Sequence, residues 1–334
     1  MRALLITLAS FTLAACGIHD HRPQHLAVAP PPAGLQDAYQ VAGEFQLPFQ
    51  DPIDVDGLEN VVFLGKHIIS GDEPNDEQSF ARLQAWGVRS ILSVDGKVPD
   101  EPMAKRFGMR YVHIPISYKG ITETEIVHMS KTFRELEGPF YVHCFHGRHR
   151  GPAAAAIGRL ILDGIAREQA IAEMRQYCST SSKYPGLFAT VAETGLPSPK
   201  QSADSSFGFD SAHRFDGLRA IMTSMARIKD RLEAAMDRNW KPDPAHPDID
   251  ALQDATQLYD ALVASARFAI PDQGPDYDRW MQASTEGAAS LLSALSKGRN
   301  TEDLANGAWD EEAVHAFESM EANCLNCHAA YRNR

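Results

Sequence analysis

The chain has 334 residues, of which 44% are hydrophobic and 23% are charged, and its formal net charge is −12. This composition is typical of globular domains and excludes both a disordered chain and a protein with many membrane spans. The negative charge excludes a general affinity for nucleic acid, because no broad basic surface remains to bind a phosphate backbone. The length predicts about two domains, whose expected partners are small molecules or proteins.

Residues 1–16 are predicted to be an export signal. Arg2 supplies a positive charge, residues 3–13 are apolar but too few to span a bilayer, and Leu-Ala-Ala-Cys ends at Cys16. This ending resembles the bacterial lipoprotein lipobox, which implies cleavage before Cys16 and lipidation of its thiol. The mature chain is then expected on the periplasmic side of a membrane, held there by the lipid alone. An ordinary cleaved signal peptide is the alternative, and it also implies export.

Residues 17–55 are rich in Pro, Ala, Gln and His and are expected to form a flexible tether. Beyond them, in residues 56–196, short β-rich runs alternate with helix-like stretches. The runs lie at 61–64, 90–94, 111–116 and 140–142, and helices are expected at 77–86 and 123–136. This alternation predicts an α/β domain with a mostly parallel sheet flanked by helices. Ligands of such sheets bind beyond the carboxyl ends of the strands.

The segment YVHCFHGRHRGPAAAA, residues 141–156, lies at one of these strand ends. Gly147 and Gly151 let the backbone curl so that successive N–H groups point inward, and the following helix adds its positive end. That field stabilises a thiolate at Cys144, the nucleophilic form of cysteine. Arg150 offers a planar fork of donors to two phosphate oxygens. The segment therefore predicts a nucleophile and a phosphate clamp in one loop.

His143-Cys144, Gly147 and Arg150 reproduce the pattern HCxxGxxR, and over about residues 56 to 195 the chain resembles the cysteine-dependent protein tyrosine and dual-specificity phosphatases. The resemblance implies their fold, a phosphocysteine formed at Cys144, and stabilisation of the transferred group by Arg150. The implied substrate is a phosphorylated small molecule or a phosphoprotein. The implied phosphate-binding loop also includes Phe145, His146, Gly147, Arg148, His149 and Gly151.

Two departures from this family bear on catalysis. Gly151 stands where the family usually has Ser or Thr, whose hydroxyl helps the thiolate to leave. Residues 117–120, Ser-Tyr-Lys-Gly, occupy the loop that usually carries an aspartic general acid. Asp95, at the end of its own predicted strand, is predicted to replace that acid, with Glu123 and Glu125 as alternatives. The departures also support an alternative function, in which the domain binds oxyanions without cleaving them.

Residues 197–211, rich in Ser, Asp and Gly, are predicted to be a linker to an all-α domain at residues 212–334. Apolar residues recur at helical spacing in its first and last helices, and proline and glycine separate the predicted helices. Short connections between them predict an antiparallel four-helix bundle. The helices are expected at about 215–238, 249–269, 275–297 and 310–332.

The last predicted helix contains Cys324-Leu325-Asn326-Cys327-His328, the CxxCH pattern of c-type haem attachment. Two thiols at this spacing can bond one haem c covalently while His328 binds the iron. A redox-active or zinc-binding cysteine pair is the alternative. The position of the pattern resembles that of cytochrome c′ and its low-spin relatives, over about residues 212 to 334. This resemblance implies Met222 as a sixth iron ligand, or a five-coordinate iron if Met222 and Met225 are core residues.

Cys144 and Cys178 are the remaining cysteines, and the sequence leaves open whether they pair. The whole chain is predicted to be an exported, lipid-anchored phosphatase-like protein fused to a c-type cytochrome. It would hydrolyse phosphate monoesters at Cys144 and carry one-electron or redox-sensing chemistry at the haem, with a redox partner protein. The alternative is a haem-based electron carrier or sensor whose first domain only binds oxyanions.

Overall fold

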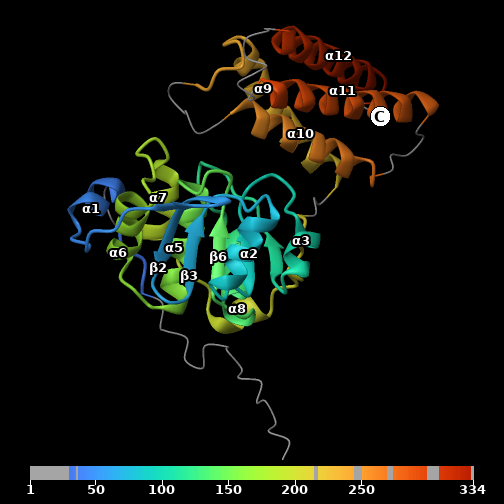
Figure 1. Cartoon of the computed structure of the whole chain (residues 1–334). Helices are drawn as coiled ribbons and strands as arrows, with labels where there is room; N and C mark the ends of the chain where they lie inside the picture. The colour runs from blue at the N-terminus through green and yellow to red at the C-terminus, as the bar shows by residue number, and fades with distance from the viewer. Residues whose placement is uncertain are drawn as a thin grey trace, which may run out of the picture.

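The structure is a computed structural model that describes residues 30–34, 37–213, 217–243, 250–268, 274–298 and 308–331. Figure 1 shows an α/β unit with four further helices above it. None of the described helices has the length and apolar character that crossing a bilayer requires. The predicted signal peptide and Cys16 lie outside the described residues, so cleavage and lipidation stay predictions.

The α/β unit is built on a mixed sheet of six strands in the order β1-β2-β3-β6-β4-β5. The strands β3, β6, β4 and β5 run parallel, whereas β1 and β2 join β3 as antiparallel neighbours. The predicted mostly parallel sheet is thus found on one side, and an antiparallel hairpin extends the other. The bounds are Ile53–Val55 for β1, Leu58–Leu64 for β2, Ile68–Gly71 for β3, Ser90–Ser93 for β4, Arg110–His113 for β5 and Phe140–His143 for β6.

Helices cover both faces of this sheet and bury a separate apolar core on each. Neighbouring residues of one strand belong to different cores: Val142 packs with Phe133 and Leu160, whereas Tyr141 packs with Phe80. The strands β3, β4 and β6 are therefore buried along their whole length, as expected for parallel strands between helices. The helices are α1 (Ala38–Glu44), α2 (Glu77–Ala85), α3 (Glu101–Arg106), α4 (Glu123–Glu135), α5 (Arg150–Leu162), α6 (Arg167–Ala172), the π-helix η1 (Glu173–Tyr177), α7 (Pro185–Glu193) and α8 (Pro199–Ala203).

Two segments that were predicted to be flexible connections pack against the α/β unit. In the predicted tether, α1 contacts α6, and Arg167 donates hydrogen bonds to the carbonyl oxygens of Pro30 and Pro31. In the predicted linker, α8 contacts α4, and Ser202 accepts a hydrogen bond from Arg134. Both segments therefore extend the α/β unit in its described part.

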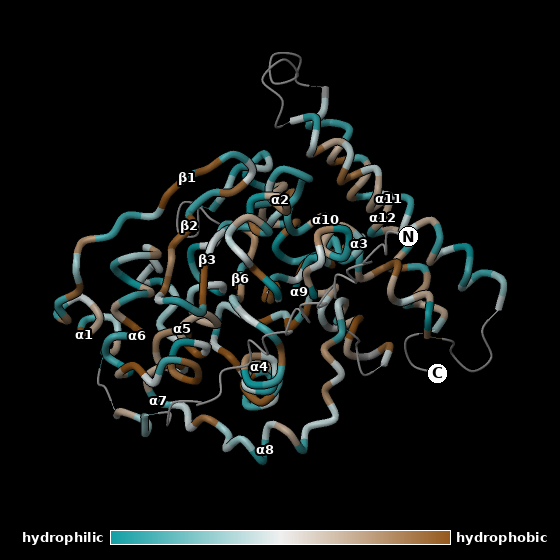
Figure 2. Tube along the Cα trace, turned by 60° about the horizontal axis from the view of Figure 1, so that its bottom comes forward, coloured by the Kyte–Doolittle hydropathy of each residue, from teal (hydrophilic) through white to brown (hydrophobic). Residues whose placement is uncertain are grey.

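The second unit consists of α9 (Leu218–Met236), α10 (Ala251–Ser265), α11 (Pro275–Lys297) and α12 (Ala308–Tyr331). These bounds lie within a few residues of the predicted helices, and one apolar core joins all four. The helices α11 and α12 are antiparallel, because Gly274 and Lys297 at the two ends of α11 contact Tyr331 and Glu312 of α12. In Figure 2 both helices alternate between hydrophilic and hydrophobic colours, whereas β2 and β3 are mostly hydrophobic. That this unit is a cytochrome stays a prediction.

The helix α10 rests on the α/β unit. The side chain of Gln253 donates a hydrogen bond to Asp95 over 2.7 Å, and Asp260 accepts one from the backbone N–H of Val98 over 3.0 Å. A Cβ atom at Gly96 would collide with the side chain of Gln257, so the two surfaces meet closely there. The second unit therefore contacts the loop that follows β4, at the carboxyl edge of the sheet.

Candidate active site

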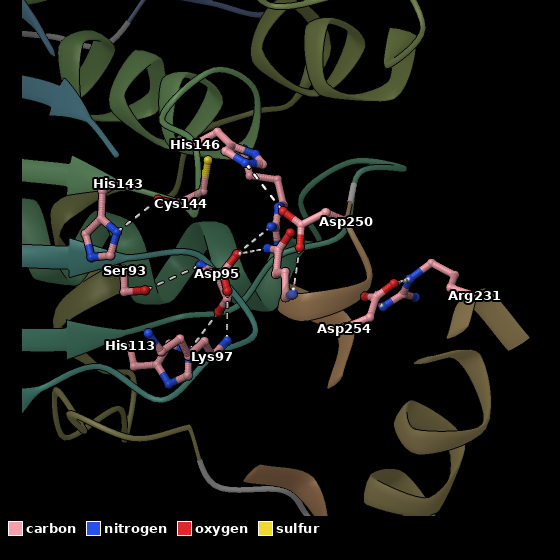
Figure 3. Close-up of polar contacts among 12 residues, drawn as sticks. Ser93, Asp95, Lys97, His113, His143, Cys144, His146, Arg231, Asp250 and Asp254 are labelled. Atoms are coloured by element: carbon pink, nitrogen blue, oxygen red, sulfur yellow. Dashed lines mark hydrogen bonds and ion pairs between the residues drawn. The ribbon is translucent and has the colours of Figure 1, made fainter. Parts of the chain in front are cut away.

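The predicted phosphate-binding loop lies at the carboxyl edge of the parallel strands. The strand β6 ends at His143, and α5 begins at Arg150, so residues 144–149 connect the two. In the register of the sheet His143 is level with Gly71 of β3 and Ser93 of β4. Residues that follow these three strands therefore surround one place, and Figure 3 shows Cys144, His146 and Asp95 gathered there. This agrees with the site expected for an α/β sheet.

Two glycines allow the loop its tight course. Gly147 has a φ of 70°, in the left-handed region, and a Cβ atom there would overlap the backbone of Gly71. At Gly151 a Cβ atom would lie 3.0 Å from the backbone nitrogen of Cys144, so the first turn of α5 packs directly against the start of the loop. The loop can therefore take this course only because Gly147 lacks a side chain, whereas the absence of a side chain at Gly151 lets α5 pack closely against Cys144.

Several N–H groups of the loop are left for a ligand. Within the described residues, the N–H groups of Phe145, Gly147 and Arg148 donate no hydrogen bond to another backbone group. His149 precedes α5 without a side-chain cap for the first N–H groups of that helix. Unpaired N–H groups in a loop and at a helix N-terminus form a binding site for an oxyanion.

Other groups of the loop are fixed by the surrounding structure. Burial lowers the pKa of His143 to about 4, so its ring is neutral; it accepts a hydrogen bond from the hydroxyl of Tyr111 over 2.7 Å. The carbonyl of Phe145 accepts the N–H of Glu73, and Arg148 donates to Asn60 over 3.0 Å. These contacts hold the loop in one conformation before any ligand binds.

Cys144 lies at the floor of the loop, with only 3% of its surface exposed. Its thiol is free, and so is that of Cys178, which is buried in the same core. Burial, together with Glu173 and Cys144, raises the pKa of the Cys178 thiol well above its usual range. The structure therefore contains no bond between the two cysteines, and Cys178 is suited to a core position.

Arg150 is the buried cation of the site, with 4% of its surface exposed. Its Nη2 donates to the carboxylate of Asp95 over 2.5 Å, and its guanidinium carbon lies 4.4 Å from the centre of the Tyr118 ring. Burial alone would lower the pKa of Arg150, but Tyr118, Asp95 and Cys144 together raise it, so the side chain is charged. Its Nε has no hydrogen-bond partner in the described part of the chain. A bound oxyanion could supply that partner.

Asp95 does not fit the predicted role of general acid. The carboxyl group is 1% exposed and accepts hydrogen bonds from Arg150, from the side chain of Gln253 and from the N–H of Lys97. Burial alone would raise the pKa of Asp95, but Arg150 and the other donors outweigh burial and lower it. A carboxylate that is held ionised has no proton to give at neutral pH. The geometry instead makes Asp95 the residue that orients Arg150.

The alternative acid Glu125 lies in a better place. Glu125 and Arg150 both line one cavity, and burial raises the pKa of the Glu125 carboxyl group. It accepts a hydrogen bond from the N–H of Thr122 over 2.7 Å, which fixes its side chain at the start of α4. Glu123 is exposed and does not line this cavity. Of Asp95, Glu123 and Glu125, Glu125 alone both lines the cavity and has a pKa above its usual range, so it is the candidate acid among these three.

The cavity has a volume of about 860 Å³ and lies between the two units. Tyr118 and Lys119, from the loop after β5, line it on the side of the α/β unit, and Arg227, Arg231 and Gln253, from α9 and α10, line it on the side of the helical unit. Figure 3 shows Asp250 and Asp254 approaching the site from this second side. The lining of the site by the helical unit could not be predicted from the sequence, because no motif in α9 or α10 indicates it.

The predicted haem residues lie on α12. Cys324 and Cys327 are both free thiols, and three residues of spacing place them on one face of the helix. The buried hydroxyl of Tyr277, whose pKa is raised by burial and by the nearby Cys327, has no hydrogen-bond partner among the described residues. Free thiols at this spacing, with an unsatisfied donor beside them, fit the covalent attachment of a haem and a contact to one of its polar groups.

The two predicted iron ligands belong to different helices. Met222 on α9 packs against the same core as Cys324 on α12, so both sides of the bundle face a common interior. His328 follows Cys327 directly, near the end of α12. Ligation of iron by Met222 and His328 stays a prediction, as does the alternative of a five-coordinate iron.

The α/β unit is similar in sequence to part of known phosphatases. It is related to the dual specificity protein phosphatase TpbA of Pseudomonas aeruginosa strain UCBPP-PA14, with 29% identity over 101 residues, 30% of this chain and 46% of TpbA. A beta-lactamase hydrolase-like protein of Agrobacterium fabrum is 36% identical over 77 residues, 20% of this chain and 18% of that protein. The chain thus spans less than half the length of these curated relatives, and no protein-family model matches it.

Two solved structures match part of the chain. The crystal structure of P. aeruginosa TpbA has a TM-score of 0.36 and 23% identity, and the match covers 42% of this chain and 87% of TpbA. The core catalytic domain of the PP-IP phosphatase SIW14 from S. cerevisiae, in complex with citrate, has a TM-score of 0.33 and 19% identity. That match covers 39% of this chain and 83% of the SIW14 domain.

Proposed function

We propose that this chain is a phosphatase that hydrolyses phosphate monoesters through a phosphocysteine at Cys144. The loop at residues 144–150 carries this proposal, because it combines a free thiol, unpaired N–H groups and an arginine with an unused donor. The relation to TpbA supports it, since that protein is named a dual specificity protein phosphatase. The alternative, binding of oxyanions without cleavage, is favoured by Gly151, which lacks the hydroxyl of the related phosphatases.

The first chemical step follows from the arrangement of the loop. The phosphate oxygens accept hydrogen bonds from the loop N–H groups and from Nε of Arg150, which places phosphorus above Cys144. The thiolate attacks phosphorus, so an S–P bond forms as the P–O bond to the leaving group breaks. Glu125 gives its proton to the leaving oxygen. The products of this step are an alcohol or phenol and a phosphocysteine.

The second step releases phosphate. A water molecule attacks the phosphocysteine, the S–P bond breaks, and the thiolate of Cys144 returns while Glu125, now ionised, accepts a proton from the water. Gly151 offers no hydroxyl to the departing sulfur, and its surroundings leave little room for one. We therefore expect hydrolysis of the phosphocysteine to limit turnover.

The proposal is tested with the full chain, matured with its export machinery intact. We expect steady hydrolysis of p-nitrophenyl phosphate, inhibited competitively by vanadate, because the loop that holds the ester also holds this oxyanion. Release of p-nitrophenol measured by absorbance gives both results. Tight vanadate binding without turnover would establish the alternative of a binding domain, and neither binding nor turnover would contradict both functions.

The role of Glu125 is tested by the basicity of the leaving group. In Glu125→Gln we expect kcat/KM for phenyl phosphate to fall by about 100-fold, and to fall at least tenfold less for p-nitrophenyl phosphate, whose leaving oxygen needs little protonation. In the native chain the phenyl phosphate rate should decrease as pH rises through the raised pKa of Glu125, because the acid loses its proton. Glu123→Gln, on the same turn but outside the cavity, is the control. Equal losses with both esters would exclude Glu125 as the acid.

For the helical unit we propose one covalent haem c, held by Cys324 and Cys327, with His328 as an iron ligand and Met222 as a candidate for the opposite side. The CxxCH pattern, the two free thiols and the unpaired hydroxyl of Tyr277 support this. Such a haem supplies one-electron transfer, which calls for a redox partner protein. We propose that the chain works on the periplasmic side of a bacterial membrane, anchored through lipid on Cys16.

A further inference from the structure

We propose that the cavity between the two units selects small phosphate monoesters that carry a second anionic group, and that Lys119 and Arg227 bind this group. The inference rests on the proposed phosphatase function and adds the substrate class. It assigns a role in recognition to α9, which belongs to the helical unit.

The size of the cavity shows that the phosphate group is only part of what it holds. A volume of about 860 Å³ lies in the range of sites for small organic ligands, whereas one phosphate group fills a small part of it. Arg150 marks the end where the reacting phosphate binds. Apolar side chains from both units also line the cavity, including Ile116 and Ile228. The remainder of the ester can therefore contact both units.

The charge of the cavity is opposite to that of the chain. In the whole sequence 44 acidic residues exceed 32 basic ones. The cavity lining has the reverse balance, with the basic residues Lys119, Arg150, Lys183, Arg227 and Arg231 and the acidic residues Glu125, Asp254 and Asp260. A basic lining in an acidic chain favours a ligand that is more negative than a simple monoester.

The partners of these charges show which cations are available. Arg231 is bound by both oxygens of Asp254, over 3.0 Å from its Nε, and Arg150 is bound by Asp95. Burial raises the pKa of Glu125 and of Asp260, so both carboxyl groups hold their protons to a higher pH than usual. Lys119 and Arg227 have no acidic partner among the described residues. Both line the same cavity, so both are available to an anionic group that binds there.

The position of Lys119 agrees with this role. It lies in the loop after β5, where the related phosphatases usually carry their aspartic acid, and a lysine there attracts an anion instead of giving a proton. Gly120, in the same loop, approaches the backbone of Gly186 so closely that the loop is fixed beside α7. Lys119 therefore lines the cavity from a loop that packs against α7, and Arg227 lines the same cavity from α9.

The test uses two sugars that differ by one phosphate, fructose 6-phosphate and fructose 1,6-bisphosphate. Their binding is measured by titration calorimetry on the full chain carrying Cys144→Ser, which keeps the loop but cannot form the phosphocysteine. We expect the bisphosphate to bind about tenfold more tightly or better, because a further charge-assisted contact contributes at least about 1.4 kcal/mol. This preference should decrease as salt is added, because the added ions screen the attraction between the second phosphate and the basic side chains.

Two variants decide which residues cause the preference. Adding Arg227→Gln to the Cys144→Ser chain should reduce the preference for the bisphosphate to about twofold. Adding Lys119→Gln instead should also reduce this preference. Arg267→Gln is the matched control, because Arg267 is exposed in the turn just after α10 and does not line the cavity. Equal affinities for the two sugars, or equal effects of Arg227→Gln and Arg267→Gln, would overturn the inference. Binding of a phosphotyrosine peptide but of neither sugar would overturn it as well.

Failure of this inference can be told apart from failure of the proposed function. Hydrolysis of p-nitrophenyl phosphate by the native chain reports on Cys144 alone, whereas the sugar titrations report on the cavity. If the chain hydrolyses p-nitrophenyl phosphate but shows no preference for the bisphosphate, only the proposed substrate class is contradicted. A preference in a chain that does not hydrolyse p-nitrophenyl phosphate supports the same cavity in an oxyanion-binding protein.

Discussion

Cys144→Ser is expected to lower the hydrolysis of p-nitrophenyl phosphate by about 10⁴-fold or more, because a serine hydroxyl is not ionised at neutral pH and attacks phosphorus poorly. The two side chains are almost the same size, and the unpaired N–H groups and Arg150 remain in place. Vanadate or phosphate should therefore still bind to the variant, which calorimetry measures. Loss of turnover with retained binding identifies Cys144 as the nucleophile.

The control for this substitution is Cys178→Ser. Cys178 is the other buried free thiol of the α/β unit and packs in the same core, but it lies outside the loop. Its substitution should leave turnover per folded molecule unchanged, with folding checked by circular dichroism. Persistent hydrolysis in Cys144→Ser would contradict the phosphocysteine, and equal losses in the two variants would show that the core, not the nucleophile, was disturbed.

Replacing Cys324 and Cys327 together by alanine is expected to remove all covalently bound haem. The native chain, matured with export and haem-attachment machinery, should stay coloured after acid–acetone extraction, whereas the double variant should lose its colour. Each single variant should keep one of two thioether bonds. The absorption spectrum of the native protein, with low-spin or high-spin bands, tests in the same material whether Met222 binds the iron.

Hydrolysis of p-nitrophenyl phosphate by the double variant is the internal control, since it shows whether the α/β unit is still folded. A native protein without extractable or covalent haem would contradict the proposed cofactor. In that case the two thiols would have to serve as a redox-active or metal-binding pair.

The parts of the site that the sequence predicted are local in the chain. Cys144, Gly147 and Arg150 lie within seven residues of one another, so their spacing alone defines the loop, and the glycines indicate its tight course. The helices of the second unit were placed within a few residues because proline and glycine separate them and apolar residues recur along them. Such features depend on neighbours in sequence and can be read without knowing the fold.

The parts that the sequence missed depend on contacts between distant segments. Asp95 looked like an acid because it follows a strand, but its role is set by Arg150 and by Gln253, which is 158 residues away. Nothing near Gln253 indicates that α10 would lie over the carboxyl edge of the sheet. The strands β1 and β3 were missed for a related reason, since they are only three and four residues long and are recognisable mainly by their pairing, whereas residues 61–64 of β2 were predicted.

The hydrogen bond between Gln253 and Asp95 connects α10 to the arginine of the site. One carboxylate oxygen, Oδ2 of Asp95, accepts from both Gln253 and Arg150, so the two donors share the same lone pairs. A shift of α10 that withdrew the amide would leave this oxygen to the guanidinium alone and would change how Arg150 is oriented toward an incoming ester. We therefore expect a displacement of α10 to change the affinity of the loop for phosphate, and by thermodynamic reciprocity we expect an occupied loop to act back on the helices.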